Sequence, residues 1–108
     1  MGSKKNILVF GSGGLFLKHK EKIESEFNIL TFLDNSPDKV GRELFNKKIE
    51  RPELYKSYDF DYVMVASSFE SEIVEQLINL GVDAKNIILL NRFFNSTFID
   101  LTLGKIEV

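Results

Sequence analysis

The chain has 108 residues with a formal net charge of −2, 44% hydrophobic and 28% charged residues, one histidine and no cysteine. This length predicts one domain with a real core but without a separate substrate domain, and the small net charge gives no field that would gather nucleic acid or an anionic membrane. The cysteine and histidine counts exclude a disulfide framework, a thiolate nucleophile and zinc sites built on Cys or His clusters, so no metal site is predicted.

The amino terminus carries no targeting pattern. Residues Met1–Lys5 are too short, and the apolar run after them is too brief, for a secretory signal or a membrane span. We therefore expect a cytoplasmic protein without a membrane span, whose partner is a small molecule rather than nucleic acid.

A glycine-rich turn directly follows the first apolar run. The run Asn6–Phe10 predicts a strand, the turn is Gly11-Ser12-Gly13-Gly14, and a helix is expected over about Gly14–Glu26. Glycines leave the backbone bare enough for a phosphate to approach and allow positive φ. A helix that begins there directs its N–H groups and positive dipole end at an anion. The turn therefore predicts a phosphate-binding site.

The glycine pattern is incomplete. In the dinucleotide-binding pattern G-x-G-x-x-G the third glycine would fall at position 16, where this chain has Phe16. That glycine normally lets the helix pack closely on the strand, so we expect a wider gap or a shifted helix. In the alternative interpretation, the glycines make only a tight turn between strand and helix and bind no ligand.

An acidic residue ends the second apolar run. Asn28–Leu33 is followed by Asp34, which lies 23 residues beyond Gly11. Dinucleotide-binding folds place at this point the carboxylate that accepts a ribose hydroxyl. Because Asp34 has no neighbouring arginine, we expect an unphosphorylated ribose, and hence NAD rather than NADP.

Weaker signals follow Asp34. Residues 35–41 are rich in turn-forming residues and predict a loop. Residues 43–50 contain a weak strand candidate interrupted by a turn at Asn46-Lys47. Pro52 is expected at the first position of a short helix.

The second half of the chain has the clearest pattern. Tyr62–Ala66 is a continuous apolar run, which predicts a central strand buried on both faces. Ser68 is expected to cap a helix over about Phe69–Leu80, which Gly81 ends. A last core strand is predicted over Asn86–Leu90. The stripe expected to be buried on the helix is Phe69, Ile73, Leu77 and Leu80.

Apolar runs alternate with helix-period segments through about residue 90. This order predicts an α/β fold, a Rossmann-like three-layer sandwich with a mainly parallel sheet of about four to five strands. We expect residues 1–90 to form this nucleotide-binding domain and residues 91–108 an extended segment. The alternation of Ile99, Leu101 and Leu103 predicts an apolar edge that pairs with another subunit or leads into a further domain.

Three stretches carry a family resemblance: ILVFGSGG (7–14), FLDNSPDKVG (32–41) and DYVMVASS (61–68). Together they resemble the Rossmann-type nucleotide-binding domains of bacterial polysaccharide-biosynthesis proteins. These include relatives of nucleotide-sugar epimerases and dehydratases, and domains that precede sugar acyltransferases or are joined to sugar methyltransferases. The resemblance implies phosphate contacts from Gly11, Ser12, Gly13 and Gly14, contacts from Asp34 and Asn35 to a ribose or base, and contacts from Ser67 and Ser68 at the mouth of the central strand.

No complete catalytic group is visible in the sequence. A short-chain dehydrogenase or epimerase needs a tyrosine acidified by a lysine four residues on, and none of the three tyrosines has one. There is also no G-x-S-x-G nucleophile elbow. Catalytic residues therefore stay unassigned.

Three functions remain open from the sequence. The first is a domain that binds NAD(H) or a nucleotide sugar for glycan biosynthesis, as a homo-oligomer or with an additional domain, while chemistry is completed elsewhere. The second is an interaction module with a vestigial nucleotide pocket. The third is a complete small oxidoreductase that acts as a dimer.

Overall fold

The computed structural model describes residues 4–92. Its strands are β1 (Lys5–Phe10), β2 (Phe27–Leu33), β3 (Glu43–Leu44), β4 (Lys47–Glu50), β5 (Tyr62–Val65) and β6 (Ile87–Leu89). Within the described part they form a six-stranded sheet in the order β3-β4-β2-β1-β5-β6. All neighbouring strands are parallel except β3 and β4, which form an antiparallel hairpin. The predicted mainly parallel sheet is confirmed, with β3 as an added edge strand.

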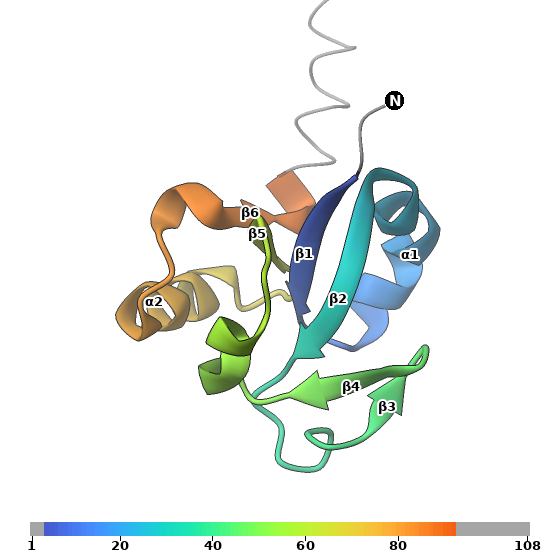
Figure 1. Ribbon diagram of the computed structural model, residues 1–108, viewed down its shortest axis with the longest axis horizontal. Helices are drawn as coiled ribbons and strands as arrows, with labels where there is room; N and C mark the ends of the chain where they lie inside the picture. Colours follow the sequence, from blue (N-terminus) through green and yellow to red (C-terminus); the bar gives the residue numbers. More distant parts are fainter. Residues whose placement is uncertain (1–3, 93–108) are drawn as a thin grey trace, which may run out of the picture.

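Helices cover both faces of this sheet (Figure 1). Helix α1 (Gly14–Glu26) lies on one face, and helix α2 (Glu70–Leu80) and the 3₁₀ helix η1 (Pro52–Ser57) lie on the other. A second 3₁₀ helix, η2 (Ala84–Asn86), leads into β6. The three-layer, Rossmann-like α/β architecture is therefore confirmed. No helix in residues 4–92 combines the length and the apolar character needed to cross a membrane.

The central strand β1 separates two cores. Ile7 and Val9 face α1, whereas Leu8 and Phe10 face α2 and η1, and all four are 0 to 2% exposed. A strand buried on both faces has to be apolar at every position, which explains the continuous apolar run in the sequence.

Phe16 belongs to the core between α1 and the sheet. Its side chain is fully buried, and its ring packs edge-on against Phe32 of β2 with ring centroids 4.9 Å apart. The aromatic residue at the place of the third glycine therefore fills the space between helix and sheet.

The hairpin turn lies one residue earlier than predicted. Its two central residues are Phe45 and Asn46, both with positive φ (52° and 65°), as a tight two-residue turn between antiparallel strands requires. The Phe45 ring packs near Phe16, with centroids 6.3 Å apart, and lies 4.4 Å from Lys20 Nζ. These contacts with α1 stabilise an aromatic residue in a conformation that favours asparagine or glycine.

The start of α2 also differs from the prediction. The helix begins at Glu70, and the hydroxyl of Ser67, rather than Ser68, accepts a hydrogen bond from the Phe69 N–H at 3.0 Å. Phe69 is 65% exposed and does not join the buried stripe, whereas Ile73 and Leu77 do. Gly81 ends the helix with φ of +113°, as predicted.

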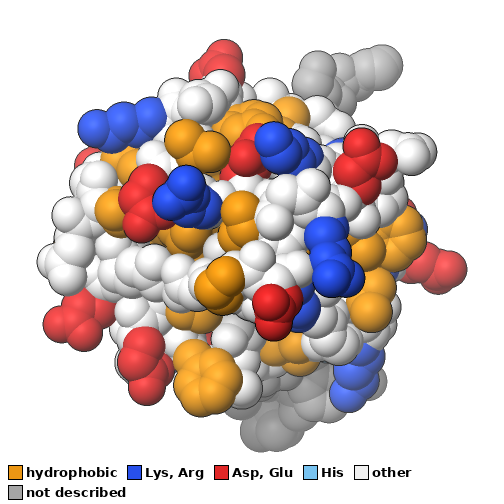
Figure 2. Space-filling view, turned by 90° about the horizontal axis from the view of Figure 1, so that it is seen from below, with side chains coloured by type: hydrophobic (Ala, Val, Ile, Leu, Met, Phe, Trp, Pro, Cys, Tyr) orange, Lys and Arg blue, Asp and Glu red, His pale blue; other side chains and the backbone are white. Residues whose placement is uncertain are grey.

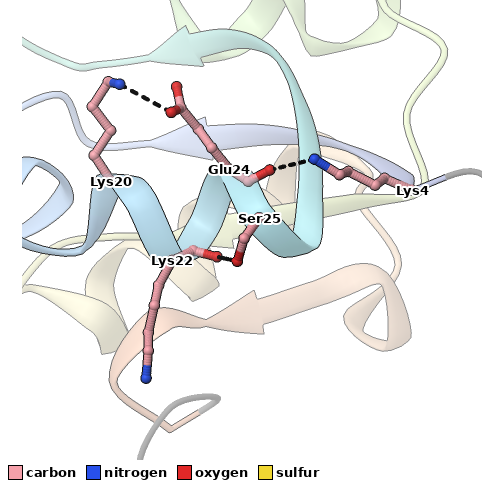
Figure 3. A network of polar contacts seen from close by, with 5 residues as sticks. All are labelled: Lys4, Lys20, Lys22, Glu24 and Ser25. Carbon is pink, nitrogen blue, oxygen red and sulfur yellow. Dashed lines mark hydrogen bonds and ion pairs between the residues drawn. The ribbon is translucent and has the colours of Figure 1, made fainter.

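Side chains complete the carboxyl-terminal end of α1, where β2 follows without a connecting loop (Figure 3). Lys4 Nζ donates to the Glu24 carbonyl at 2.7 Å, and Lys20 pairs with the Glu24 carboxylate at 3.0 Å. The Ser25 hydroxyl donates to the Lys22 carbonyl at 2.7 Å. The Lys4 bond thus occupies the Glu24 carbonyl, one of the last four of the helix, which have no partner within it.

The far end of the described chain only partly matches the prediction. The last core strand is shorter than expected, because residues 90–92 are helical. The rest of the expected extended segment, residues 93–108 with Ile99, Leu101 and Leu103, lies outside the described residues.

Gly11 lies where three strand ends meet. Its N–H donates to the Leu33 carbonyl of β2 at 2.8 Å, and its φ is +117°. A Cβ atom at this position would lie 2.3 Å from the carbonyl oxygen of Ala66, which follows β5. Only glycine fits this backbone, because both the conformation and the space exclude a side chain.

We expect Gly11→Ala to lower the free energy of unfolding by more than about 2 kcal/mol, because the methyl group must displace the backbone at Ala66. Urea denaturation followed by circular dichroism measures this change. Gly14→Ala is the matched control: a Cβ there meets nothing within 4 Å, so its stability should stay equal or rise by up to about 1 kcal/mol. Equal urea midpoints of unfolding for Gly11→Ala and the wild type would contradict the close approach of Gly11 to the Ala66 carbonyl.

Candidate functional site

Three loops with predicted site residues meet at the carboxyl edge of the sheet. They follow β1, β2 and β5, which are neighbours in the sheet. The chain order reverses between β1 and β5, and such a switch point is where open α/β sheets bind ligands. The β2 arrow in Figure 1 points toward this edge, and Figure 2 views the molecule from that side. Lysine and arginine side chains lie there among acidic and apolar ones rather than in a patch of one sign.

The start of α1 is open to an anion. Gly13 is the N-cap residue, no side chain caps the helix, and its first turn contains no acidic residue. A Cβ at Gly14 would meet nothing within 4 Å, so the space around the first turn is open. The first N–H groups of a helix lack partners within it and favour negative charge.

Ser12 and Asp34 join the ends of β1 and β2. The Ser12 side chain is 9% exposed, and its hydroxyl donates to Asp34 Oδ2 at 2.8 Å. Asp34 Oδ1 accepts from the Ser36 N–H at 2.9 Å. Each carboxylate oxygen can accept a second hydrogen bond, so the group keeps acceptor capacity for a ligand. The carboxylate is held toward the glycine turn, as the predicted ribose contact requires.

The remaining predicted residues are placed differently. The Asn35 side-chain amide forms a reciprocal pair with Gln76 of α2, with both hydrogen bonds at 2.9 Å. Ser67 accepts the Phe69 N–H described above, and Ser68 is exposed. The pair uses one amide hydrogen and one oxygen lone pair of Asn35, so the other hydrogen and lone pair stay available to a ligand, and Ser68 is accessible as well.

The sequence did not identify Lys39 as a site residue. Its Nζ lies 3.7 Å from the position that a Cβ would take at Gly13. The loop doubles back through hydrogen bonds from the Lys39 and Val40 N–H groups to the Ser36 carbonyl at 3.0 and 3.1 Å. Within residues 4–92 Lys39 has no ion pair. The turn-forming residues predicted a loop there but not its direction.

The two helix starts at this edge differ in charge. The first turn of α2 contains Glu70 and Glu72, whereas that of α1 contains no acid and lies near Lys39. Negative side chains already occupy the positive end of the α2 dipole. An anionic group is therefore favoured at α1 over α2.

A cavity of about 360 Å³ lies beside Asp34. The loop after β2 and the start of η1 line it, through Asp34, Asn35, Pro37, Val40, Arg51, Pro52 and Glu53. Arg51, which is distant from Asp34 in the sequence, therefore lines the same cavity. Leu33 pairs with Glu50 in parallel register, so the residues that follow β2 and β4 meet although they are far apart in sequence.

A second hollow, of about 480 Å³, lies between α2 and β6. Its apolar lining includes Val74, Ile78 and Leu89, and Arg92 lies at the end of the described chain. It contains none of the predicted site residues, so a role as an interaction module would use a different surface.

Comparison with solved structures supports the fold. The structure is similar to a UDP-D-quinovosamine 4-dehydrogenase from Vibrio fischeri, with 22% sequence identity, a TM-score of 0.63, and coverage of 88% of this chain and 87% of that chain. It is also similar to RSP, a Rex-family repressor, in a complex with beta-NAD+ and operator DNA. In that case the identity is 15%, the TM-score is 0.58, and the match covers 96% of this chain and 58% of the repressor.

A second RSP complex, with beta-NADH, matches at 15% identity and a TM-score of 0.58, covering 96% of this chain and 62% of that chain. At such low identities these TM-scores show a shared Rossmann-like fold alone. No curated protein matches the sequence. A protein-family model described as C2185-like, N-terminal, matches residues 3–88, most of the chain. The chain therefore belongs to the C2185-like N-terminal family.

Proposed function

We propose that this chain is the nucleotide-binding domain of a polysaccharide or glycan biosynthesis protein, and that it holds NAD(H) or a nucleotide sugar. The observation that carries the proposal is the Asp34 carboxylate, held by Ser12 beside the open glycine turn. The UDP-sugar dehydrogenase and the NAD complexes of the repressor give independent support, since both share the fold.

The diphosphate of the ligand lies at the start of α1 in this proposal. The N–H groups after Gly13 and Gly14 and the positive end of the helix dipole favour its charge. Lys39 approaches the same turn from the loop after β2 and adds a positive charge. The acidic first turn of α2 disfavours the alternative position.

The ribose lies at Asp34. Its hydroxyls donate to the carboxylate, which Ser12 and the Ser36 N–H already hold in position. Asn35 contacts the ribose or base with the amide hydrogen and the oxygen lone pair that its pair with Gln76 leaves free. Ser67 and Ser68, which follow β5, contact the part of the ligand beyond the diphosphate.

Catalysis belongs to another domain or subunit in this proposal. Residues 1–90 hold the nucleotide, and residues 91–108 lead to a further domain or pair with another subunit. Because no catalytic residue is assigned in this chain, that domain or subunit completes the chemistry. The ligand is a small molecule rather than nucleic acid, and the protein acts in the cytoplasm.

Asp34→Asn should weaken binding by about tenfold or more, because a charged acceptor is lost and hydrogen bonds to charged groups contribute about 1.5 to 3 kcal/mol. Isothermal titration calorimetry with NADH, UDP-sugars and nucleoside diphosphates measures the affinity. Asp38→Asn is the matched control, since Asp38 is exposed in the same loop. Absence of binding by the wild type to all these ligands, or equal binding by Asp34→Asn, would disprove the proposal.

Lys39→Met should lower the affinity for a nucleoside diphosphate by roughly five- to tenfold and leave the affinity for the nucleoside nearly unchanged. The reason is loss of one cation near the diphosphate, worth about 1 kcal/mol in a partly exposed position. Lys85→Met, which removes the same charge at the exposed η2 helix, is the control. A parallel loss for nucleoside and diphosphate would argue against a phosphate contact.

A further inference from the structure

Two amide side chains link the loop after β2 to helix α2. Asn35 follows Asp34 in that loop, and Gln76 lies in α2, the helix that follows β5. Asn35 Nδ2 donates to Gln76 Oε1, and Gln76 Nε2 donates to Asn35 Oδ1, both at 2.9 Å. Because β1 separates β2 from β5 in the sheet, the pair joins the chain segments that follow the two neighbours of β1.

The start of the loop after β2 is held by three elements. Asp34 Oδ2 accepts from the Ser12 hydroxyl in the glycine turn, and the Asp34 N–H donates to the Glu50 carbonyl of β4 at 3.1 Å. The amide pair adds a contact with α2. The adjacent residues Asp34 and Asn35 thus bond to different elements, and the backbone that they share is anchored from each of them.

Helix α2 gives Gln76 a fixed starting point. The next residue, Leu77, is fully buried, and Ile73, three residues earlier, is 7% exposed. Both belong to the same core cluster as Val65 of β5. Gln76 itself is half-buried, whereas Asn35 is exposed. The packed helix therefore restrains Gln76, and Gln76 restrains Asn35.

This restraint matters for an exposed side chain such as Asn35. An asparagine without a partner samples several orientations and loses that freedom when it binds a ligand. Ordering one side chain weakens binding by roughly two- to tenfold. The reciprocal pair fixes the Asn35 amide before a ligand arrives, while one amide hydrogen and one oxygen lone pair of Asn35 stay available.

We propose that Gln76 is a positioning residue of the nucleotide site and acts through Asn35. It holds the Asn35 amide and the start of the loop after β2 in the conformation that receives the ribose and base, and it does not contact the ligand itself. This inference rests on the proposed function, because that function assigns the ribose and base to Asp34 and Asn35. It adds α2 to the elements that shape the site.

A double-mutant cycle tests this role. Isothermal titration calorimetry of the full chain with NADH, UDP and ADP measures the affinity, and the ligand that the wild type binds most tightly is used for the variants. Gln76→Ala should weaken that ligand about three- to fivefold, because the Asn35 side chain must then be ordered on binding. In the Asn35→Ala background the same substitution should have no further effect.

Asn79→Ala is the matched control. Asn79 is an exposed amide residue of the same helix, and within residues 4–92 its side chain forms no hydrogen bond. Its affinity for the ligand should equal that of the wild type. The urea midpoints of unfolding of Gln76→Ala and Asn79→Ala, measured by circular dichroism, should lie close together, because water replaces the lost partner of an exposed amide.

The amide pair can also be tested without a ligand. In NMR spectra the side-chain NH₂ signals of Asn35, assigned by their absence in Asn35→Ala, should shift toward those of a free amide in Gln76→Ala. They should stay unchanged in Asn79→Ala. Unchanged Asn35 signals in Gln76→Ala would overturn the inference, whichever ligand the domain binds.

The outcomes separate this inference from the proposed function. Equal ligand affinity of Gln76→Ala and the wild type, a loss that adds to that of Asn35→Ala, or the same loss in Asn79→Ala overturns the positioning role and leaves a nucleotide-binding domain. Tighter binding by Gln76→Ala also overturns it, because the pair would then compete with the ligand. If the wild type binds none of the three ligands, the proposed function fails and the positioning role fails with it.

Discussion

The missing side chain at Gly11 lets the chain leave β1 between the ends of its two neighbours. On one side the Gly11 N–H bonds to the Leu33 carbonyl, and on the other its backbone approaches the Ala66 carbonyl too closely for a Cβ atom. This passage directs Ser12 toward Asp34 and places Gly13 at the start of α1. The site thus depends on a backbone constraint at the centre of the sheet.

The charged side chains differ between the two sides of this carboxyl edge of the sheet. Lys39 and the uncapped start of α1 lie on one side of the switch point, and Glu70 and Glu72 begin α2 on the other. An anionic group is drawn toward α1 by both the helix dipole and the lysine. Under the proposed function, a ligand that reaches from Asp34 past the glycine turn places its anionic groups at α1 and its uncharged part near Ser67 and Ser68.

Local patterns predicted most of the fold. Apolar runs identified β1, β2, β5 and β6, and the bounds of α1 and the ending at Gly81 agree with the sequence. These features depend on neighbours within a few residues, which a sequence pattern records. The start of α2 was predicted one residue too early because Ser68 matches the usual cap residue, whereas the N-cap is Phe69 without a side-chain cap and the Ser67 hydroxyl bonds to the Phe69 N–H in a local turn.

The site was less predictable because its partners are distant in sequence. Arg51 reaches the cavity through the parallel pairing of β2 and β4, and Gln76 reaches Asn35 from α2. Lys39 lies in a segment predicted as a loop, but its direction depends on the bonds to Ser36. The glycine spacing and the acidic residue at the end of β2 indicate where such a site lies. Which charged residues surround it depends on the order of the strands in the sheet.

The replacement of the third glycine by Phe16 has a limited effect on the anion site. The ring is directed into the core against Phe32, and α1 nevertheless begins at Gly14 with open space around its first turn. The substitution therefore alters the packing between helix and sheet, while the N–H groups of the first helical turn stay open. An incomplete glycine pattern is consequently weak evidence against phosphate binding when the missing glycine belongs to the packing face of the helix.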